Sequence, residues 1–114
     1  MNSQKKSGLI NGFGIEASSH KYGLFQHICE SLEIVTANGE LVKCSKDANS
    51  ELYYAIPWSY GSLGFLVCAE IKIVPCKDYV HLTYITYTSK QALVDRFTEE
   101  SLKPFDEAYE FIEG

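Results

Sequence analysis

Two alternating apolar runs flank the dipeptide Asn38-Gly39, and this pattern limits the possible folds more than any other in the chain. Residues 32–37 and 40–44 have the composition of strands, and both turn residues tolerate the positive φ of a two-residue type I′ turn. The segment therefore predicts a tight antiparallel hairpin. A hairpin here argues against the parallel strand–helix–strand unit of a Rossmann fold.

Other periodic segments predict the remaining elements. Apolar spacing from Leu24 to Cys29 predicts a short helix or turn, and residues 49–56 predict a polar-capped helix that Pro57 ends by pushing Ile56 out of the helical region. Residues 65–74 alternate like a half-buried strand that ends at Pro75. The face expected to be buried comprises Phe65, Val67, Ala69, Ile71 and Ile73.

The last third of the chain predicts a strand over residues 79–87 and then a helix. Thr88 or Ser89 would cap that helix, with Gln91 completing a capping box, and Leu93, Val94 and Phe97 would supply its apolar face. Pro104 ends the pattern, and residues 109–114 resemble a strand cut off at the chain end. The expected fold class is α+β with a mostly antiparallel sheet.

Length and composition limit the function classes. The chain has 114 residues, so one domain is the ceiling, and its 46% hydrophobic and 22% charged residues are typical of a soluble globular protein. A net charge of -5 argues against nucleic acid as a partner. The chain has no apolar run long enough for a transmembrane helix, and residues 1–7 lack the apolar core of a signal peptide.

The four cysteines indicate neither a metal site nor a redox motif. Cys29, Cys44, Cys68 and Cys76 form no C-x-x-C pair and have no histidine at zinc-site spacing. We expect all four to be reduced thiols in the core or at its boundary, which points to a reducing environment.

A glycine-rich stretch near the start of the chain is the main candidate for ligand binding. Residues 12–17 match the dinucleotide fingerprint G-x-G-x-x-A, but the preceding strand is four residues at best, and Ser18, Ser19, His20 and Gly23 are poor helix formers. The Rossmann interpretation is therefore disfavoured.

Two other kinds of site are weaker still. A Cys-His nucleophilic site made by His20, His27 and Cys29 with Glu30 lacks a nucleophile on an elbow or at a helix N-terminus. Trp58 is expected to be a packing residue, and His81 is expected on the polar face of a strand.

Five stretches carry a resemblance when they are taken together and in order. They are GFGIEASSHKYGLFQH at residues 12–27, the S-E-L-Y-Y-A segment within 47–55, IPWSYGSLGFLV at 56–67, AEIKIVP at 69–75 and KDYV at 77–80. In this order they resemble the flavin-binding region of the delta-24-sterol reductase family. The resemblance covers roughly residues 8–100. This family is similar to flavoenzymes with the vanillyl-alcohol-oxidase (PCMH) type of FAD domain, in which the cofactor lies between two α+β lobes.

The resemblance implies a domain organisation. Residues 1–7 would be a polar lead, 8–78 the second lobe of the FAD domain and 79–114 the truncated start of the substrate (cap) domain. The first lobe, a membrane anchor and most of the sterol-binding domain would lie outside the chain.

The resemblance also implies FAD as cofactor and a set of residues that contact it. Gly12 and Gly14 would let the backbone approach the cofactor, while Ser18 and Ser19 would donate to phosphate or ribitol oxygens. No residue is assigned a catalytic role, and none a metal. The implied cofactor-binding residues are Gly12, Phe13, Gly14, Ile15, Glu16, Ala17, Ser18, Ser19, His20, Lys21, Tyr22, Gly23, Leu24, Gly61, Gly64 and Ile71.

The activity implied by the resemblance is reduction of the C24–C25 side-chain double bond of a sterol, with NADPH as reductant and flavin as carrier. The family would place the whole enzyme at the endoplasmic reticulum membrane, facing the cytosol, whereas this chain alone is expected to be inactive. The alternative is a truncated, non-catalytic fragment or isoform that does not bind FAD alone. The oligomeric state is not indicated.

Overall fold

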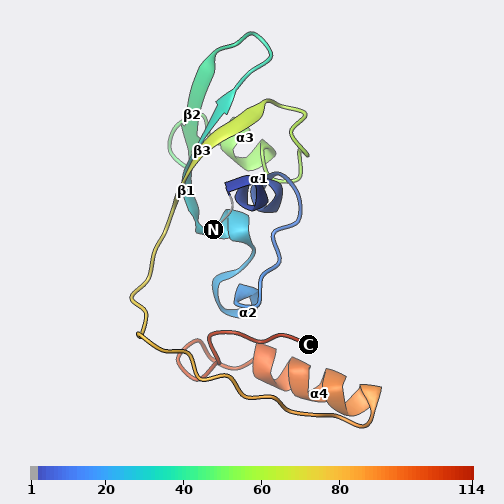
Figure 1. Cartoon of the computed structure of the whole chain (residues 1–114). Helices are drawn as coiled ribbons and strands as arrows, with labels where there is room; N and C mark the ends of the chain where they lie inside the picture. The colour runs from blue at the N-terminus through green and yellow to red at the C-terminus, as the bar shows by residue number, and fades with distance from the viewer. Residues whose placement is uncertain (1–2) are drawn as a thin grey trace.

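Three antiparallel strands form the sheet of the molecule, with strand order β2-β1-β3. They are β1 (Cys29–Val35), β2 (Leu41–Ser45) and β3 (Phe65–Ile71). The computed structural model describes residues 3–114 and measures 55 × 30 × 26 Å along its principal axes. Figure 1 shows the reason for this length: the sheet and its helices lie at one end, and the last part of the chain extends away from them.

The predicted hairpin is confirmed, but its predicted turn type is wrong. Val35 pairs with Leu41 at the closed end of the hairpin, and Thr36 N–H donates to Glu40 O (2.9 Å). Gly39 N–H donates to Thr36 O (2.9 Å), and within the turn only Gly39 has positive φ, at 81°. The loop is therefore a type I turn followed by a left-handed glycine, a three-residue arrangement that also suits the strand twist.

Two bulges change which residues of β1 and β3 face the core. The pairing of β1 with β3 leaves one residue unpaired at Glu30 and one at Val67. An extra residue reverses the alternation of faces, so Leu66 packs against the core together with Ala69 and Ile71. The predicted buried face is thus wrong at Phe65 and Val67, which are 75% and 49% exposed. Ile73 lies beyond the end of the strand and is exposed.

Short helices precede and follow the strands. Next to the sheet lie α1 (Ser3–Asn11), the 3-10 helix η1 (Phe25–Ile28) and α3 (Ser50–Ala55), whereas α2 (Ser19–Tyr22) lies against η1 and away from the strands (Figure 1). The predicted helix after Gly23 is confirmed as η1, and the polar lead expected at residues 1–7 is helical from Ser3 onward.

Helix α3 is confirmed, but the expected chemistry of its ends is not. Asn49 is left-handed (φ 52°), and its side chain donates to Lys43 O (2.9 Å) instead of capping the helix. Ile56 remains in the right-handed helical region (φ -61°, ψ -47°) despite the following proline. The preference against helix before proline is outweighed here because Ile56 N–H bonds Leu52 O and its side chain is buried.

One apolar cluster makes the core between the sheet and the helices. Tyr53 also donates its hydroxyl to Cys29 O (2.6 Å), so the polar end of the buried ring is satisfied. Burial raises the pKa of the Cys29 thiol to about 11. The cluster comprises Ile10, Cys29, Leu32, Ile34, Cys44, Tyr53 and Ile56. All four cysteines are free thiols, but Cys68 and Cys76 are exposed, contrary to the expectation of core or boundary positions.

The C-terminal extension, residues 72–114, contains one helix and no strand. The strands predicted over 79–87 and 109–114 are wrong, because within the described chain no neighbouring strand pairs with either segment. Helix α4 (Lys90–Ser101) is confirmed, and Ser89 caps it by accepting from Ala92 N–H (3.1 Å). Gln91 instead bonds Asp95, so the capping box is not formed. No helix within residues 3–114 is long and apolar enough to cross a membrane.

Candidate functional site

The glycine-rich loop, residues 12–24, is held at both ends by neighbouring helices. Gly12 N–H donates to Gly8 O at the end of α1 (2.9 Å), and Phe25 N–H at the start of η1 donates to Gly14 O (2.8 Å). Between these anchors, the short helix α2 points away from the sheet (Figure 1). The loop is therefore fixed at its base, and α2 is carried toward the extension.

Packing within the chain itself requires two of the glycines. A Cβ on Gly14 would lie 2.5 Å from Leu9 O and 2.7 Å from Phe25 Cβ, and a Cβ on Gly12 would lie 2.9 Å from Gly8 O. These distances are too short for ordinary contacts, so the loop could not keep this path with alanine at Gly14. Close approach of α1 and η1 explains these glycines without a ligand.

On the same path, three successive backbone donors have no partner among the described residues. Among residues 3–114, no protein acceptor is hydrogen-bonded to the N–H groups of Phe13, Gly14 and Ile15. Phe13 and Ile15 are exposed, and Ser18 makes no side-chain cap bond to α2. Ser19 differs, because its Oγ already accepts from Glu16 N–H (2.8 Å). A row of unpaired N–H groups suits an anion or a polar cofactor edge.

A second turn, residues 57–64, lies against the base of the loop. Tyr60 N–H donates to Asn11 O (2.9 Å), and the rings of Phe13 and Trp58 meet edge to face with centroids 4.3 Å apart. Trp58 and Tyr60 have φ values of 72° and 51°, which are unusual for bulky residues and are found mostly at turns and functional sites. Trp58 makes the packing contact expected of it, yet remains half-exposed.

The two glycines of the second turn have different surroundings. Gly64 (φ 156°) approaches β1 so closely that a Cβ would lie 2.7 Å from Val35 O, whereas a Cβ on Gly61 (φ 80°) would have Gly64 O, 4.0 Å away, as its nearest neighbour. Both help to line an open depression formed by residues 35–37 and 61–65. Ile71 lies at the opposite end of β3, paired with Cys29 and roughly 20 Å from Gly64 by strand rise.

The structure therefore divides the expected cofactor-binding residues into three places. Gly12 and Phe13 meet the turn that contains Gly61, whereas Gly14 packs against Leu9 and Phe25. Residues 17–22 lie against the C-terminal extension, and Ile71 lies at the other end of the sheet.

Three residues near these places were not among the expected set. Trp58 and Tyr60 lie in the turn before Gly61. In the sequence, only the run P-W-S-Y-G could have indicated that these two residues lie at the site. Glu110 approaches α2 from a point almost ninety residues later in the chain, and no sequence pattern indicated it.

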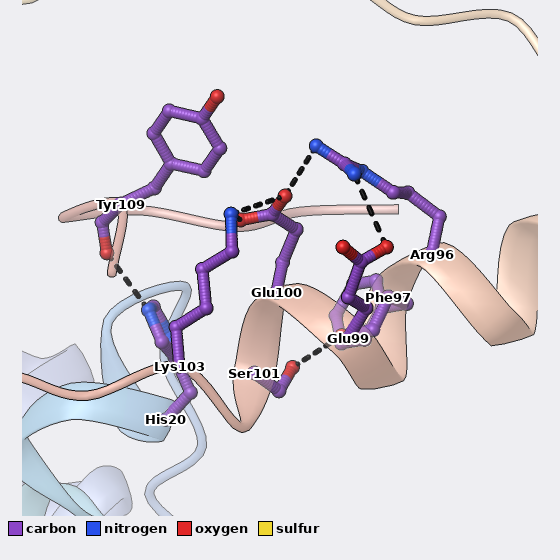
Figure 2. A network of polar contacts seen from close by, with 8 residues as sticks. All are labelled: His20, Arg96, Phe97, Glu99, Glu100, Ser101, Lys103 and Tyr109. Atoms are coloured by element: carbon purple, nitrogen blue, oxygen red, sulfur yellow. Dashed lines mark hydrogen bonds and ion pairs between the residues drawn. The ribbon is translucent and has the colours of Figure 1, made fainter. Parts of the chain in front are cut away.

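Charged groups join α2 to the extension. Lys21 Nζ donates to one carboxylate oxygen of Glu110 (2.5 Å), and the Tyr22 hydroxyl donates to the other (2.9 Å). The hydrogen bonds from Lys21 and Tyr22 hold the pKa of the Glu110 carboxyl below its usual value, while the Glu110 bond raises the pKa of Tyr22. Figure 2 shows His20 next to the backbone of Tyr109, and its Nε2 lies 2.8 Å from Tyr109 O.

The extension has an ion-pair cluster of its own at the end of α4. Figure 2 shows Arg96 and Lys103 on either side of the Glu100 carboxylate, which is buried, and Glu99 paired with Arg96 (3.1 Å). Two cations on one buried carboxylate fix the end of the helix and the turn after it. The cluster is balanced in charge and holds the extension in shape.

The geometry does not support a cysteine nucleophile. Cys29 is buried, its thiol donates to Phe25 O (3.6 Å), and its raised pKa keeps the unreactive protonated form. His27 Nδ1 accepts from Leu24 N–H (3.0 Å), so the ring is engaged locally. Within residues 3–114, His, Cys, Asp and Glu side chains form no group of three that could hold a metal ion.

Comparison with known proteins shows one group of relatives clearly, although no family model matches the chain. Delta(24)-sterol reductase of Homo sapiens is 52% identical over 107 residues, which are 94% of this chain and 20% of the relative. The Arabidopsis thaliana protein of the same name is 50% identical over 113 residues, again 94% of this chain and 20% of the relative. The chain is homologous to Delta(24)-sterol reductases. It spans about a fifth of their length.

More distant similarities also lead to oxidoreductases. Cytokinin dehydrogenase 4 of Oryza sativa is 28% identical over 94% of this chain and 20% of its own length. Among solved structures, 6-hydroxy-D-nicotine oxidase of Arthrobacter nicotinovorans matches 58% of this chain and 15% of its own with a TM-score of 0.54 and 29% identity. The α+β fold class is confirmed, and this solved oxidase shares it over the matched part of the chain.

Proposed function

We propose that this chain is the FAD-binding second lobe of an oxidoreductase that resembles Delta(24)-sterol reductase. The observation that carries the proposal is the row of N–H groups at Phe13, Gly14 and Ile15 that bond no acceptor in the described part of the chain. Their loop belongs to the stretch shared with those relatives. Such donors can bind phosphate or the polar edge of a flavin. The cofactor, when bound, would supply hydride transfer.

In this proposal, each part of the chain positions the cofactor. The loop backbone donates hydrogen bonds, the Ser18 hydroxyl adds a donor, and Phe13 with Trp58 shields one side from water. Lys21 and His20 contribute positive charge or a donor near the phosphates. Residues 8–78 form this lobe in the proposal, and residues 79–114 begin the substrate domain.

The finer activity rests on the resemblance and on the name of the relatives. We propose NADPH as the reductant, the C24–C25 double bond of a sterol as the group reduced, and the endoplasmic reticulum membrane as the site of the whole enzyme. None of the described residues is offered as the proton donor. The chain alone is proposed to be inactive, because a single lobe supplies only one side of the cofactor site.

Flavin binding tests the proposal directly. FAD is titrated into this chain and into a fusion that places the first FAD lobe of a Delta(24)-sterol reductase before it, and flavin absorbance is read after gel filtration. The fusion should carry a yellow chromophore and the chain alone should not. A colourless fusion would contradict FAD binding, and stoichiometric flavin in the chain alone would contradict the need for two lobes.

A matched pair of hydroxyl deletions then locates the cofactor. Ser18→Ala in the fusion should weaken FAD binding about fivefold, the usual size of one lost hydrogen bond. Thr83→Ala, which removes an exposed hydroxyl in the extension, should leave FAD affinity unchanged. Equal affinities of the two variants would exclude Ser18 as a cofactor contact.

A further inference from the structure

The C-terminal extension covers the loop segment that the proposed function assigns to cofactor phosphates. Besides the Glu110 contacts, Ile112 N–H donates to Ala17 O (2.8 Å), and Phe105 stacks edge to face on Tyr22 with centroids 5.5 Å apart. Figure 1 shows the last residues of the chain running past α2. Residues 105–112 therefore form a clasp over residues 17–22, and the name clasp is kept for this segment.

Lys21 is the central group under the clasp. Its side chain is only 6% exposed, although it belongs to a four-residue helix on an otherwise open part of the molecule. The ammonium lies between the Glu110 carboxylate and the face of the Phe105 ring, 4.5 Å from the ring centroid. A buried ammonium needs a compensating negative charge, and Glu110 provides it.

Tyr22 completes a two-donor arrangement. Its hydroxyl and the Lys21 ammonium each donate to a different oxygen of one carboxylate. This is the geometry in which two donors hold a carboxylate or the oxygens of a phosphate group. Together the two residues form a small anion-binding site, and the anion that occupies it belongs to the chain itself.

We propose that Glu110 occupies an anion site that otherwise binds a phosphate group of the cofactor, so that the clasp and the cofactor exclude each other. This inference rests on the proposed function for the identity of the cofactor, but the anion site and its internal occupant are independent of flavin. Closing of the clasp neutralises Lys21 and covers Ala17. Binding of a phosphate at Lys21 and Tyr22 displaces Glu110 and exposes the apolar face of Phe105.

Two variants separate this competition from a general charge effect. Glu110→Gln removes the competing charge at the site, whereas Glu113→Gln makes the same change in charge three residues later, at an exposed side chain that bonds no described residue. Hydrogen exchange at the Ile112 amide, followed by NMR on the 114-residue chain, reports whether the clasp is closed. Amide signals of β1 report that the sheet remains folded.

Pyrophosphate is the first probe, because it carries the anion without a flavin. It should shift the Lys21 and Tyr22 signals, speed exchange at Ile112, and bind Glu110→Gln about fivefold more tightly than the unmodified chain or Glu113→Gln. Three results would each overturn the competition. They are equal pyrophosphate affinities for the three proteins, binding that leaves the Ile112 amide protected, and no binding to Glu110→Gln.

FAD binding to the two-lobed fusion is the second measurement and distinguishes the two proposals. Tighter FAD binding by Glu110→Gln, with no change in Glu113→Gln, supports both. If the fusions bind pyrophosphate as described but do not bind FAD, the anion site is supported and the flavin assignment is contradicted. FAD binding that is indifferent to Glu110→Gln would support the flavin lobe and overturn the competition.

Discussion

The sheet with its helices, up to Ile71, and the C-terminal extension are held together by different forces. Every residue of the apolar core cluster lies before residue 57, while in the described extension Glu100 is the one fully buried residue and it is charged. Aromatic residues of the extension such as Tyr79 and Tyr84 are almost fully exposed. The first region is stabilised mainly by apolar burial, and the second is attached by hydrogen bonds and ion pairs.

This difference indicates that the contact between the two regions is the part of the molecule most open to regulation. Apolar packing is not weakened by charge screening, whereas attachment through ion pairs can be released by a competing anion, by salt or by acid. The candidate phosphate-binding residues lie where the weakly attached region touches the firmly packed one. Four predictions test this contrast, in order of decreasing effect.

The largest effect is expected in the core. Ile34 is 1% exposed and Ile73 is 86% exposed, so the two isoleucines form a matched pair. Ile34→Ala should lower the free energy of unfolding by about 2–5 kcal/mol because it leaves a cavity, and Ile73→Ala should change it by less than about 0.5 kcal/mol. Urea denaturation measures both, and labelling of the buried Cys29 and Cys44 thiols should become fast in Ile34→Ala only. Similar costs at the two positions would contradict the contrast in packing.

The next effect lies at the glycine loop. Gly14→Ala should destabilise the chain by about 1–3 kcal/mol, because its Cβ would overlap Leu9 O and Phe25. Gly8→Ala is the control: it sits inside α1, and a Cβ there would meet no atom of a neighbouring element within 4 Å, so it should stabilise by up to about 1 kcal/mol. Thermal unfolding followed by circular dichroism shows whether each variant is less or more stable than the unmodified chain. A neutral Gly14→Ala would show that the loop takes another path.

A smaller effect is expected inside the extension. Ser89→Ala should destabilise α4 by about 1 kcal/mol because Ala92 N–H loses its acceptor, while Thr88→Ala should have little effect. Hydrogen exchange in residues 90–101 is the measurement. Exchange in β1 should not change, since the core does not depend on the extension. Slowed folding or opening of β1 in Ser89→Ala would mean that the two regions fold as one unit.

The smallest effect is the response of the clasp to pH. The pKa of Glu110 is lowered in the folded chain, so the clasp is stabilised above the usual pKa of a glutamate and loses that contribution as pH falls through the lowered value. The protection of the Ile112 amide against hydrogen exchange should therefore fall in acid, because the clasp opens more often, while the amides of β1 remain protected. Because Glu110 is half-exposed, we expect less than about 1 kcal/mol. Glu110→Gln should have a weaker clasp whose opening no longer depends on this titration.

The sequence predicted many local elements well and their tertiary relations less well. The hairpin, η1, α3, α4 and the Ser89 cap follow from short-range patterns, and the structure has all of them. Residues 79–87 have the composition of a strand, but composition cannot supply a partner, and in the described chain they pair with none. The assignment of residues 12–24 to a cofactor remains a prediction, and the structure adds unpaired donors that suit it.

The sequence by itself determined where the chain turns and where its helices begin, because turn residues, caps and periodicity act over a few neighbouring positions. Only the tertiary structure decided which faces are buried, since one extra residue at Glu30 and one at Val67 reverse the alternation of the paired strands. It also decided that Lys21 meets Glu110, 89 residues away along the chain. Side chains so distant in sequence meet only when the whole chain is folded, and no local pattern records that meeting.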